Sequence, residues 1–277
     1  MFPVQTMCQV LKVSSSGYYS FRKALPGKIE TENMRLLERI KVIHARSDQT
    51  YGSPRITDSL REEGFKVSRP RVARLMREQG VRAKTKRKFR VTTDSDHDYP
   101  ISPNLLNQNF SVDSPGKVWT SDITYISTRE GWLYLTVVMD LFNREIIGWA
   151  MSHGLRASET TIPALWQACS RFHPEQNLIF HSDRGVQYAC NVFRERLSKH
   201  QMIQSMSGKG NCYDNSVTES FFSTLKKDLI YHRNFKTRSE ARQSIFQYVE
   251  IFYNRIRKHS TLGNLSPVQF RQLKRAA

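Results

Sequence analysis

The chain has 277 residues and enough aromatic side chains, among them 15 Phe and 11 Tyr, to bury a sizeable core. Its formal net charge of +18 favours a polyanionic partner such as nucleic acid over the alternative, a basic soluble protein without one. The 4 cysteines are far apart and form no CxxC pair, which argues against a disulfide framework or zinc knuckle and predicts reduced thiols in the cytoplasm. No run of 18 apolar residues and no signal-peptide pattern is present, so no membrane partner is expected.

The first 48 residues are predicted to form an N-terminal helical segment, 1–48. Residues 8–23, CQVLKVSSSGYYSFRK, contain a short apolar helix, a turn and serine caps ahead of aromatic residues, a layout that suits a helix-turn-helix remnant. Residues 31–46 place apolar side chains on one helical face, which predicts an amphipathic helix.

Residues 49–91 are predicted to form a helix-turn-helix DNA-binding region. The segments SPRITDSLREEG and SRPRVARLMREQG each indicate a short helix with proline near its start and glycine at its end, and Ser68 is expected to cap the second. Residues 54–90 carry 13 basic and 4 acidic side chains. The alternative is the solvated basic face of a small helical bundle. The DNA contacts predicted in this region are Arg69, Arg71, Arg74, Lys84, Lys86, Arg87 and Lys88.

Residues 92–112 are polar and are predicted to be a linker, and beyond them the apolar pattern changes to that of strands. The core domain is expected at 113–232 and a C-terminal helical extension at 233–277. The order βββαβαβα predicts an α/β (α+β) fold with a mixed five-stranded sheet and flanking helices, preceded by an all-α region. The strands are expected at 118–127, 132–140, 144–152, 177–183 and 204–207. The helices are expected at 157–172, 187–200, 215–231 and 238–257, with a last one from Pro267.

Three acidic residues are expected to meet at one edge of this sheet. Asp122 lies within the first strand, Asp183 ends the fourth, and Glu219 lies one turn into the long helix. If the first and fourth strands are neighbours, both aspartates reach the same edge, and a buried acid there needs a cation or another partner. Carboxylate oxygens suit Mg²⁺ or Mn²⁺, and two such ions activate the attacking oxygen and stabilise the leaving oxygen of a phosphodiester. The alternative is three unrelated structural acids.

The spacing of these acids resembles that of a known family. Asp122 and Asp183 are 60 residues apart, and Asp183 and Glu219 are 35 apart, not counting the acids themselves. This is similar to the DDE signature of retroviral integrases and insertion-sequence transposases. The segments VWTSDITYI, MDLFNREIIGW, HSDRGVQYA, NCYDNSVTESFFSTLKKDL and YNRIRKHSTLGNLSPVQF resemble second-reading-frame (OrfB) transposases, and the likeness covers nearly the whole chain. The His/His/Cys/Cys spacing of the retroviral N-terminal zinc site is missing.

The resemblance implies a ribonuclease H-like integrase core at 113–232 that binds two divalent ions, Mg²⁺ or Mn²⁺, and catalyses DNA cleavage and strand transfer. Asp122 would bridge the ions, and Asn215 would orient the third acid or contact DNA. The catalytic metal ligands that the resemblance implies are Asp122, Asp183 and Glu219. The DNA contacts that it adds are Asn215, Lys226 and Lys227.

The resemblance also implies partners. They are the terminal inverted repeats of an insertion sequence, its target DNA, further copies of the chain in a synaptic complex, and an upstream reading frame joined by frameshifting. The expected location is the cytoplasm of a bacterium, at the nucleoid when bound to DNA.

Some residues in these motifs have other expected roles. His181 either positions substrate or water or is a strand-end histidine with a backbone partner, and Arg184 is expected to face a DNA phosphate. Asp140 is interpreted as a turn cap, and the motif at 253–259 as packing. Two other functions stay open: a non-catalytic DNA-binding protein, such as a repressor descended from a transposase, and a structure-selective nuclease on the same fold.

Overall fold

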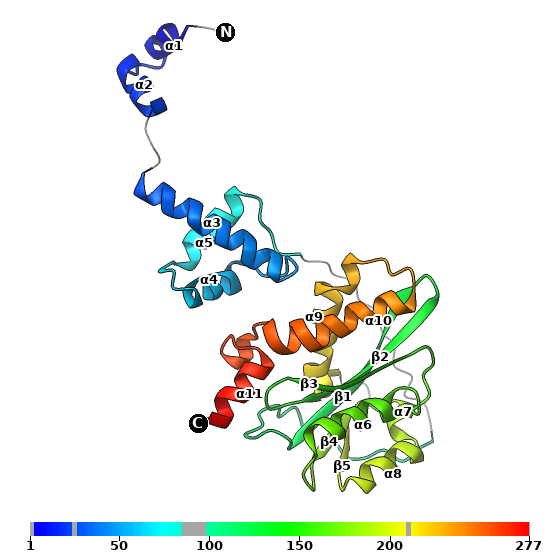
Figure 1. Ribbon diagram of the computed structural model, residues 1–277. Helices are drawn as coiled ribbons and strands as arrows, with labels where there is room; N and C mark the ends of the chain where they lie inside the picture. The colour runs from blue at the N-terminus through cyan, green and yellow to red at the C-terminus, as the bar shows by residue number, and fades with distance from the viewer. Residues whose placement is uncertain (1–2, 24–26, 85–97, 209–211, 277) are drawn as a thin grey trace. The chain divides into compact units, whose positions relative to one another are not determined.

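The computed structural model describes residues 3–23, 27–84, 98–208 and 212–276. The chain divides into two compact units, residues 1–82 and 83–277 (Figure 1). The helices described in the first unit are α1 (Val4–Val10), α2 (Ser15–Lys23), α3 (Lys28–Arg46), α4 (Ser53–Glu62) and α5 (Arg69–Glu78).

Helices α3, α4 and α5 pack through the apolar stripes that the sequence predicts. Gly64 and Gly80 follow α4 and α5 with φ of +88° and +65°, a backbone that favours glycine, so both predicted helix ends are confirmed. Ser68 precedes α5, but its side chain makes no capping hydrogen bond. That detail of the prediction is wrong, because Pro70 removes one of the N–H groups that a cap binds. The buried side chains are Leu36, Ile40, Ile43, Ile56, Leu60, Val72, Leu75 and Met76.

A mixed five-stranded sheet forms the centre of the second unit, as predicted. The strands lie in the order β3-β2-β1-β4-β5. β2 is antiparallel to β1 and β3, whereas β4 is parallel to β1 and β5. The first and fourth strands are therefore neighbours, which is the condition for their two aspartates to lie close together. The strands are β1 (Val118–Thr128), β2 (Gly131–Asp140), β3 (Ile146–Ser152), β4 (Ile179–Ser182) and β5 (Ile203–Met206).

Helices cover both faces of this sheet (Figure 1). On one face lie α6 (Thr161–Phe172), α7 (Val186–Ala189) and α8 (Asn191–Lys199), whose apolar side chains join those of Trp119 and Phe180 in a single core. A Cβ atom at Gly148 of β3 would collide with the carbonyl of Ala164 and with Ala168, so α6 packs directly on the strand backbone. On the other face lies α9 (Ser216–Asp228).

The remaining helical elements are short or C-terminal. Within the part of the chain that the structure describes, no helix is both long and apolar enough to span a membrane. These elements are η1 (Cys212–Asn215), η2 (Ile230–His232), α10 (Arg238–Phe246), the π-helix η3 (Gln247–Ile256), η4 (Ser260–Leu262) and α11 (Pro267–Ala276).

Several helix boundaries differ from the predicted ones. The helix predicted at 157–172 begins at Thr161, and the helix predicted at 187–200 is two helices separated at Cys190, whose backbone is extended. The helix predicted at 238–257 continues beyond Phe246 with π-type hydrogen bonds. Apolar spacing continues through these points, and it does not register a local change in backbone hydrogen bonding.

The C-terminal motif at 253–259 packs against α9. Tyr253 packs edge-to-face on Phe221 of α9, with 4.7 Å between ring centroids. At the end of α9, Arg257 Nε lies 2.9 Å from Asp228 Oδ2, and both side chains are about nine-tenths buried. The predicted packing role of this motif therefore agrees with the structure.

Candidate active site and DNA-binding surface

The parallel pairing of β1 and β4 brings two aspartates to the same level of the sheet. Thr120 pairs with His181 across these strands. Two residues further along each strand stand Asp122 and Asp183. The second lies directly after β4 ends, where Gly185 N–H donates to its Oδ1 over 3.0 Å and orients the carboxylate.

Two hydrogen bonds attach the start of α9 to β1. Thr218 Oγ1 donates to Thr120 Oγ1 over 2.8 Å, between two fully buried side chains. Asn215 Nδ2 donates to the carbonyl of Ser121 over 3.1 Å. Because Glu219 directly follows the bonded threonine, these contacts bring its carboxylate to the edge where the two aspartates lie.

The three acids influence one another electrostatically. Burial and the charge of Asp183 raise the pKa of Asp122 well above its usual range, and Glu219 adds to this shift. Burial and Asp183 also raise the pKa of Glu219. Among the described residues, no three acidic, histidine or cysteine side chains already have the spacing of a metal site. The pKa shifts nevertheless indicate that the acids repel one another, and a bound cation would relieve that repulsion.

Lys226 lies two turns beyond the acid of α9. Burial lowers the pKa of its ammonium group, and the charge of Asp122 opposes that shift. Its Nζ lies 5.3 Å from the centroid of the Tyr125 ring. Lys227 is exposed. The predicted basic pair thus places one charge near the acids and one at the surface.

Asn215 belongs to the interior of the site. Its side chain is only 4% exposed and bonds to β1, the arrangement expected of a residue that orients the start of α9. Its Oδ1 is buried without a hydrogen-bond partner. An unpaired amide oxygen here is a further hard donor beside the carboxylates.

Sequence reasoning missed a buried polar layer behind the acids. Tyr188 OH lies 2.8 Å from Ser121 Oγ, and burial with the charges of Asp122 and Asp183 raises the pKa of this phenol. The partners in this bond are 67 residues apart, and those in the threonine pair 98 apart. No local pattern indicates contacts across such separations.

His181 lies in the interior rather than at the substrate surface. Its ring is fully buried, with Nδ1 2.8 Å from Ser205 Oγ and Nε2 3.2 Å from Ser207 Oγ. Burial lowers its pKa to about 4, so the ring is neutral at pH 7. Of its two predicted roles, that of a strand-end histidine held by hydrogen bonds fits the structure, and serine hydroxyls are among its partners.

Two other charged residues near the ends of strands bind backbone groups. Arg184 Nε donates to the Ser207 carbonyl over 2.6 Å. Asp140 accepts two backbone N–H groups, over 2.8 and 2.9 Å, and caps a turn as predicted.

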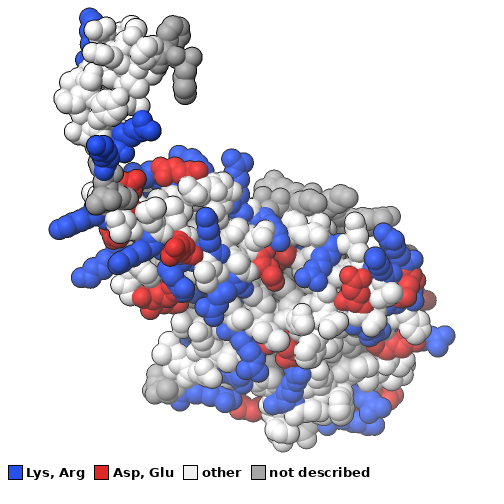
Figure 2. Space-filling model, turned by 45° about the horizontal axis from the view of Figure 1, so that its top comes forward, with Lys and Arg blue, Asp and Glu red and all other residues white. Residues whose placement is uncertain are grey.

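The DNA contacts predicted at 69–88 differ in exposure. Arg69 and Arg74 are exposed on α5, where Arg74 Nε lies 3.8 Å from Glu78 Oε1. Arg71 forms a 2.9 Å ion pair with Glu32 of α3. Lys84 is half-buried. Basic side chains outnumber acidic ones on the face drawn in Figure 2. Lys86, Arg87 and Lys88 lie outside the described residues.

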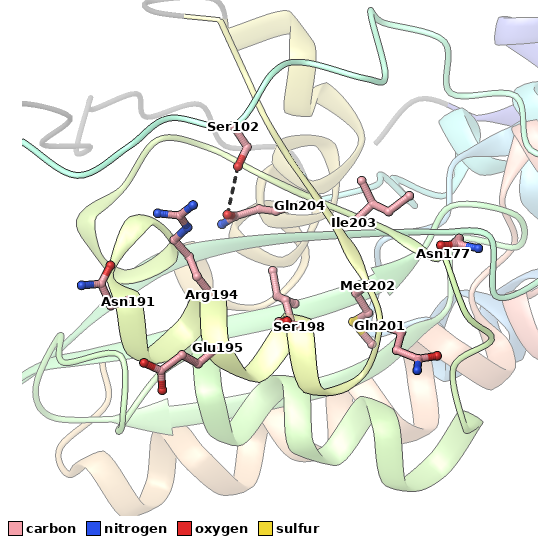
Figure 3. A pocket seen from close by; sticks show the side chains of 11 residues that line it. Ser102, Asn177, Asn191, Arg194, Glu195, Ser198, Gln201, Met202, Ile203 and Gln204 are labelled. Atoms are coloured by element: carbon pink, nitrogen blue, oxygen red, sulfur yellow. Dashed lines mark hydrogen bonds between the residues drawn. The ribbon is translucent and has the colours of Figure 1, made fainter.

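A hollow of about 670 Å³ lies between α8 and β5, away from the acids (Figure 3). Its lining is polar and includes Arg194, Glu195 and Ser102, whose hydroxyl donates to Gln204 Oε1 over 3.0 Å. None of the three acids lines it. The acids instead occupy a sheet edge, an arrangement that suits a long polymer better than a small enclosed ligand.

Comparison with known proteins places this arrangement in a family. Models of an HTH-like domain and of the integrase core domain match residues 31–89, 112–212 and 219–274. The chain is 47% identical to an uncharacterized 31 kDa protein of insertion element IS600 from Shigella sonnei, over 96% of this chain and 97% of that one. It is 43% identical to transposase InsF of insertion sequence IS3A from Escherichia coli K12, over 97% and 94%. The chain belongs to the family of insertion-sequence transposases.

This transposase therefore combines a DNA-binding HTH-like domain with an integrase core, and its function is the transposition of an insertion sequence. The predicted ribonuclease H-like class is confirmed by the sheet order together with the integrase-core match. The solved HTLV-2 integrase catalytic core domain, in complex with magnesium, resembles it with a TM-score of 0.42 and 18% identity, over 57% of this chain and 97% of that one.

Proposed function

We propose that this transposase is a DDE polynucleotidyl transferase in which Asp122, Asp183 and Glu219 would hold two divalent ions, Mg²⁺ or Mn²⁺. The observation that carries the proposal is the approach of these acids from β1, β4 and α9, where the charge of Asp183 raises the pKa of both Asp122 and Glu219. A cation relieves that repulsion, and the carboxylates with Asn215 Oδ1 form a set of hard oxygen donors.

The proposed reaction has two displacement steps at phosphorus. In the first, water attacks a phosphodiester at each end of the element, the bond to the 3′ oxygen breaks, and a 3′-hydroxyl is left. In the second, that hydroxyl attacks a target phosphodiester, a new P–O bond forms, and the target's 3′ oxygen leaves. Bound divalent ions supply positive charge to the phosphate oxygens. The chain forms no covalent bond to DNA. It acts by orienting the reacting groups and by stabilising charge.

The basic residues have separate tasks in this proposal. The ammonium group of Lys226 interacts electrostatically with Asp122 and binds the DNA phosphate next to the reacting one. The exposed Lys227 binds the DNA backbone further from the reacting phosphate. Arg69 and Arg74 on α5 bind the element end away from the reacting bond.

The test is Asp183→Asn, with Asp113→Asn as a matched control because Asp113 is exposed and outside the site. In an assay with Mg²⁺ and labelled duplexes that carry the element's own ends, Asp183→Asn should lose cleavage and joining by at least about a hundredfold. Its affinity for the duplex should stay the same. Normal transposition by this variant in cells would contradict the proposal. Cleavage without joining by the parent chain would favour a nuclease, and binding alone a repressor.

Two element ends must be held together, so we also propose that the working complex contains at least two copies of the chain, located on the nucleoid in the cytoplasm. An upstream reading frame joined to this one is proposed as a further partner. Sedimentation of the chain with paired-end DNA, alone and as the fusion, tests both proposals. A complex with one copy per two ends would contradict the first. Equal activity of the chain with and without the upstream frame would contradict the second.

A further inference from the structure

The first two helices form a pair at the start of the first unit. α1 and α2 contact each other and are joined by only four residues, 11–14 (Figure 1). In this turn Lys12 has φ of +52°, and Val13 N–H donates to the Cys8 carbonyl over 3.0 Å. A turn of this length with one left-handed residue is how two helices are joined in a helix-turn-helix.

The start of α2 is fixed by a capping hydrogen bond. Ser14 Oγ accepts the N–H of Gly17 over 3.0 Å. A Cβ atom on Gly17 would stand 2.7 Å from the same hydroxyl, so glycine leaves room for the cap. Cys8 is the one described residue of α1 and α2 that is buried, where α1 meets the rest of the pair. The cap and the turn together set the direction in which α2 points.

One face of α2, called the donor face, consists only of hydroxyl and ammonium side chains, each of which can donate a hydrogen bond. Ser16, Tyr19, Ser20 and Lys23 follow the spacing i, i+3, i+4, i+7 and are all exposed. The first 29 residues contain four basic residues and no Asp or Glu. In Figure 2 the part of the chain that contains α1 and α2 carries Lys and Arg side chains. Hydroxyls and a cation without a nearby acid complement a polyanion with acceptor-rich edges.

We propose that α1 and α2 form a second helix-turn-helix, in which the donor face of α2 enters the major groove of duplex DNA. This site is separate from the HTH-like match, which begins at residue 31. It contacts DNA through Ser16, Ser20 and Lys23, and so lengthens the DNA segment that one copy of the chain covers. The inference does not depend on the metal chemistry proposed above.

The competing occupant of this unit is a second copy of the chain. Val10, Leu11 and Phe21 are 76%, 71% and 83% exposed, and such side chains often mark a protein contact. We favour DNA because the donor face carries no acid and its four residues keep strict helical spacing.

The experiment measures DNA binding by the full chain in EDTA, on an Asp183→Asn background, so that catalysis plays no part. The probes are a duplex carrying one end of the element that encodes the chain and a mixed-sequence duplex of equal length. Ser16→Ala/Ser20→Ala/Lys23→Ala should bind the end duplex about tenfold or more weakly and protect a shorter segment in footprinting. The controls Gln5→Ala/Gln9→Ala on exposed positions of α1, and Lys274→Ala on α11, should bind as the parent does.

A second variant that should bind DNA more tightly distinguishes a lost DNA contact from misfolding, because a misfolded helix pair would not gain affinity. Ser20→Arg should tighten binding to the mixed-sequence duplex and steepen the salt dependence of log K by about one. The proposal is overturned if the triple variant keeps the parent's affinity and footprint, or if Ser20→Arg leaves the salt slope unchanged. It is also overturned if the triple variant loses self-association in sedimentation while its DNA binding is intact. Failure of Asp183→Asn to abolish strand transfer would leave this inference untouched.

Discussion

Helices α3–α5 and the five-stranded core hold their charged residues in different ways. On α5, Arg69 and Arg74 are exposed, and the local helix alone decides where they point. In the core, Asp122 and Glu219 come from elements far apart in the chain, and buried bonds such as Thr218 to Thr120 bring them together. The exposed positive charge of α5 is thus a local property, whereas the cluster of acids exists only after long-range folding.

This difference has an energetic side. Exposed arginines stay hydrated, so placing them on a helix costs little. Acids this close repel one another, and Asp122 in particular loses hydration, which is why the pKa values of Asp122 and Glu219 rise. The core must therefore be stable enough to hold an unfavourable cluster until a cation arrives.

The largest difference between the two regions is expected when the ion pair between Arg257 and the end of α9 is removed. The core should lose stability, and helices α3–α5 should not. Arg257→Met leaves the buried carboxylate of Asp228 without its cationic partner and with the Tyr248 hydroxyl as a hydrogen-bond donor, and the free energy of unfolding of the core should fall by about 3 kcal/mol. Tryptophan fluorescence in urea measures this, because all 4 tryptophans lie in the second unit. At urea concentrations that unfold its core, the variant should still bind DNA through the first unit. Equal loss of DNA binding and core stability would show that the two regions are not independent.

The acid cluster should also make cation binding depend on pH. Because folding raises the carboxyl pKa values of Asp122 and Glu219, the metal-free core loses stability as pH rises through those values. Mg²⁺ binds the ionised forms, so at a hundred times its Kd it should stabilise the core by about 2.7 kcal/mol at pH 8 and far less at pH 5. Thermal unfolding with and without Mg²⁺ measures the difference. Equal stabilisation at both pH values would contradict the prediction, and Asp122→Asn should remove the effect.

The threonine pair offers a finer test of how the core positions its third acid. Thr218→Val keeps the shape of the side chain but removes the bond to Thr120, and it should cost about 1–2 kcal/mol of stability and about tenfold in strand transfer. Thr136→Val is the matched control, since Thr136 is equally buried in β2 and its hydroxyl has no partner. It should leave both properties unchanged or slightly improved. Equal losses in the two variants would mean that the hydroxyl pair has no positioning role.

The smallest effect is expected within α5. Arg74→Ala should reduce the salt dependence of DNA binding by about one unit in the log–log slope, and the loss of its exposed ion pair with Glu78 should cost no more than about 0.5 kcal/mol. Arg71→Ala should instead remove the ion pair with Glu32 and cost less than about 1 kcal/mol, with a smaller change in slope. Titrations at several salt concentrations and urea unfolding followed by far-UV circular dichroism measure both. The reverse pattern would mean that the ion pair to α3 opens when DNA binds.

Much of the fold could be predicted because its signals are local. Short apolar segments separated by tight polar turns marked the strands, and the order of elements implied a mixed sheet, as observed. Helix ends at Gly64 and Gly80 followed from the need for a left-handed residue. The break at Cys190 and the π-helix after Phe246 could not be predicted, because they depend on backbone hydrogen bonds that apolar spacing does not encode.

The sequence by itself determined which residue types this transposase has available: a basic helical region, and Asp122, Asp183 and Glu219 at the spacing of a known family. Only the tertiary structure decided which of the candidates meet. It turned His181 and Arg71 inward to partners from other segments, and it joined the start of α9 to β1 beside the acids. Helix and strand periodicity follow from neighbours in the chain, whereas a buried polar contact depends on which distant group arrives to satisfy it.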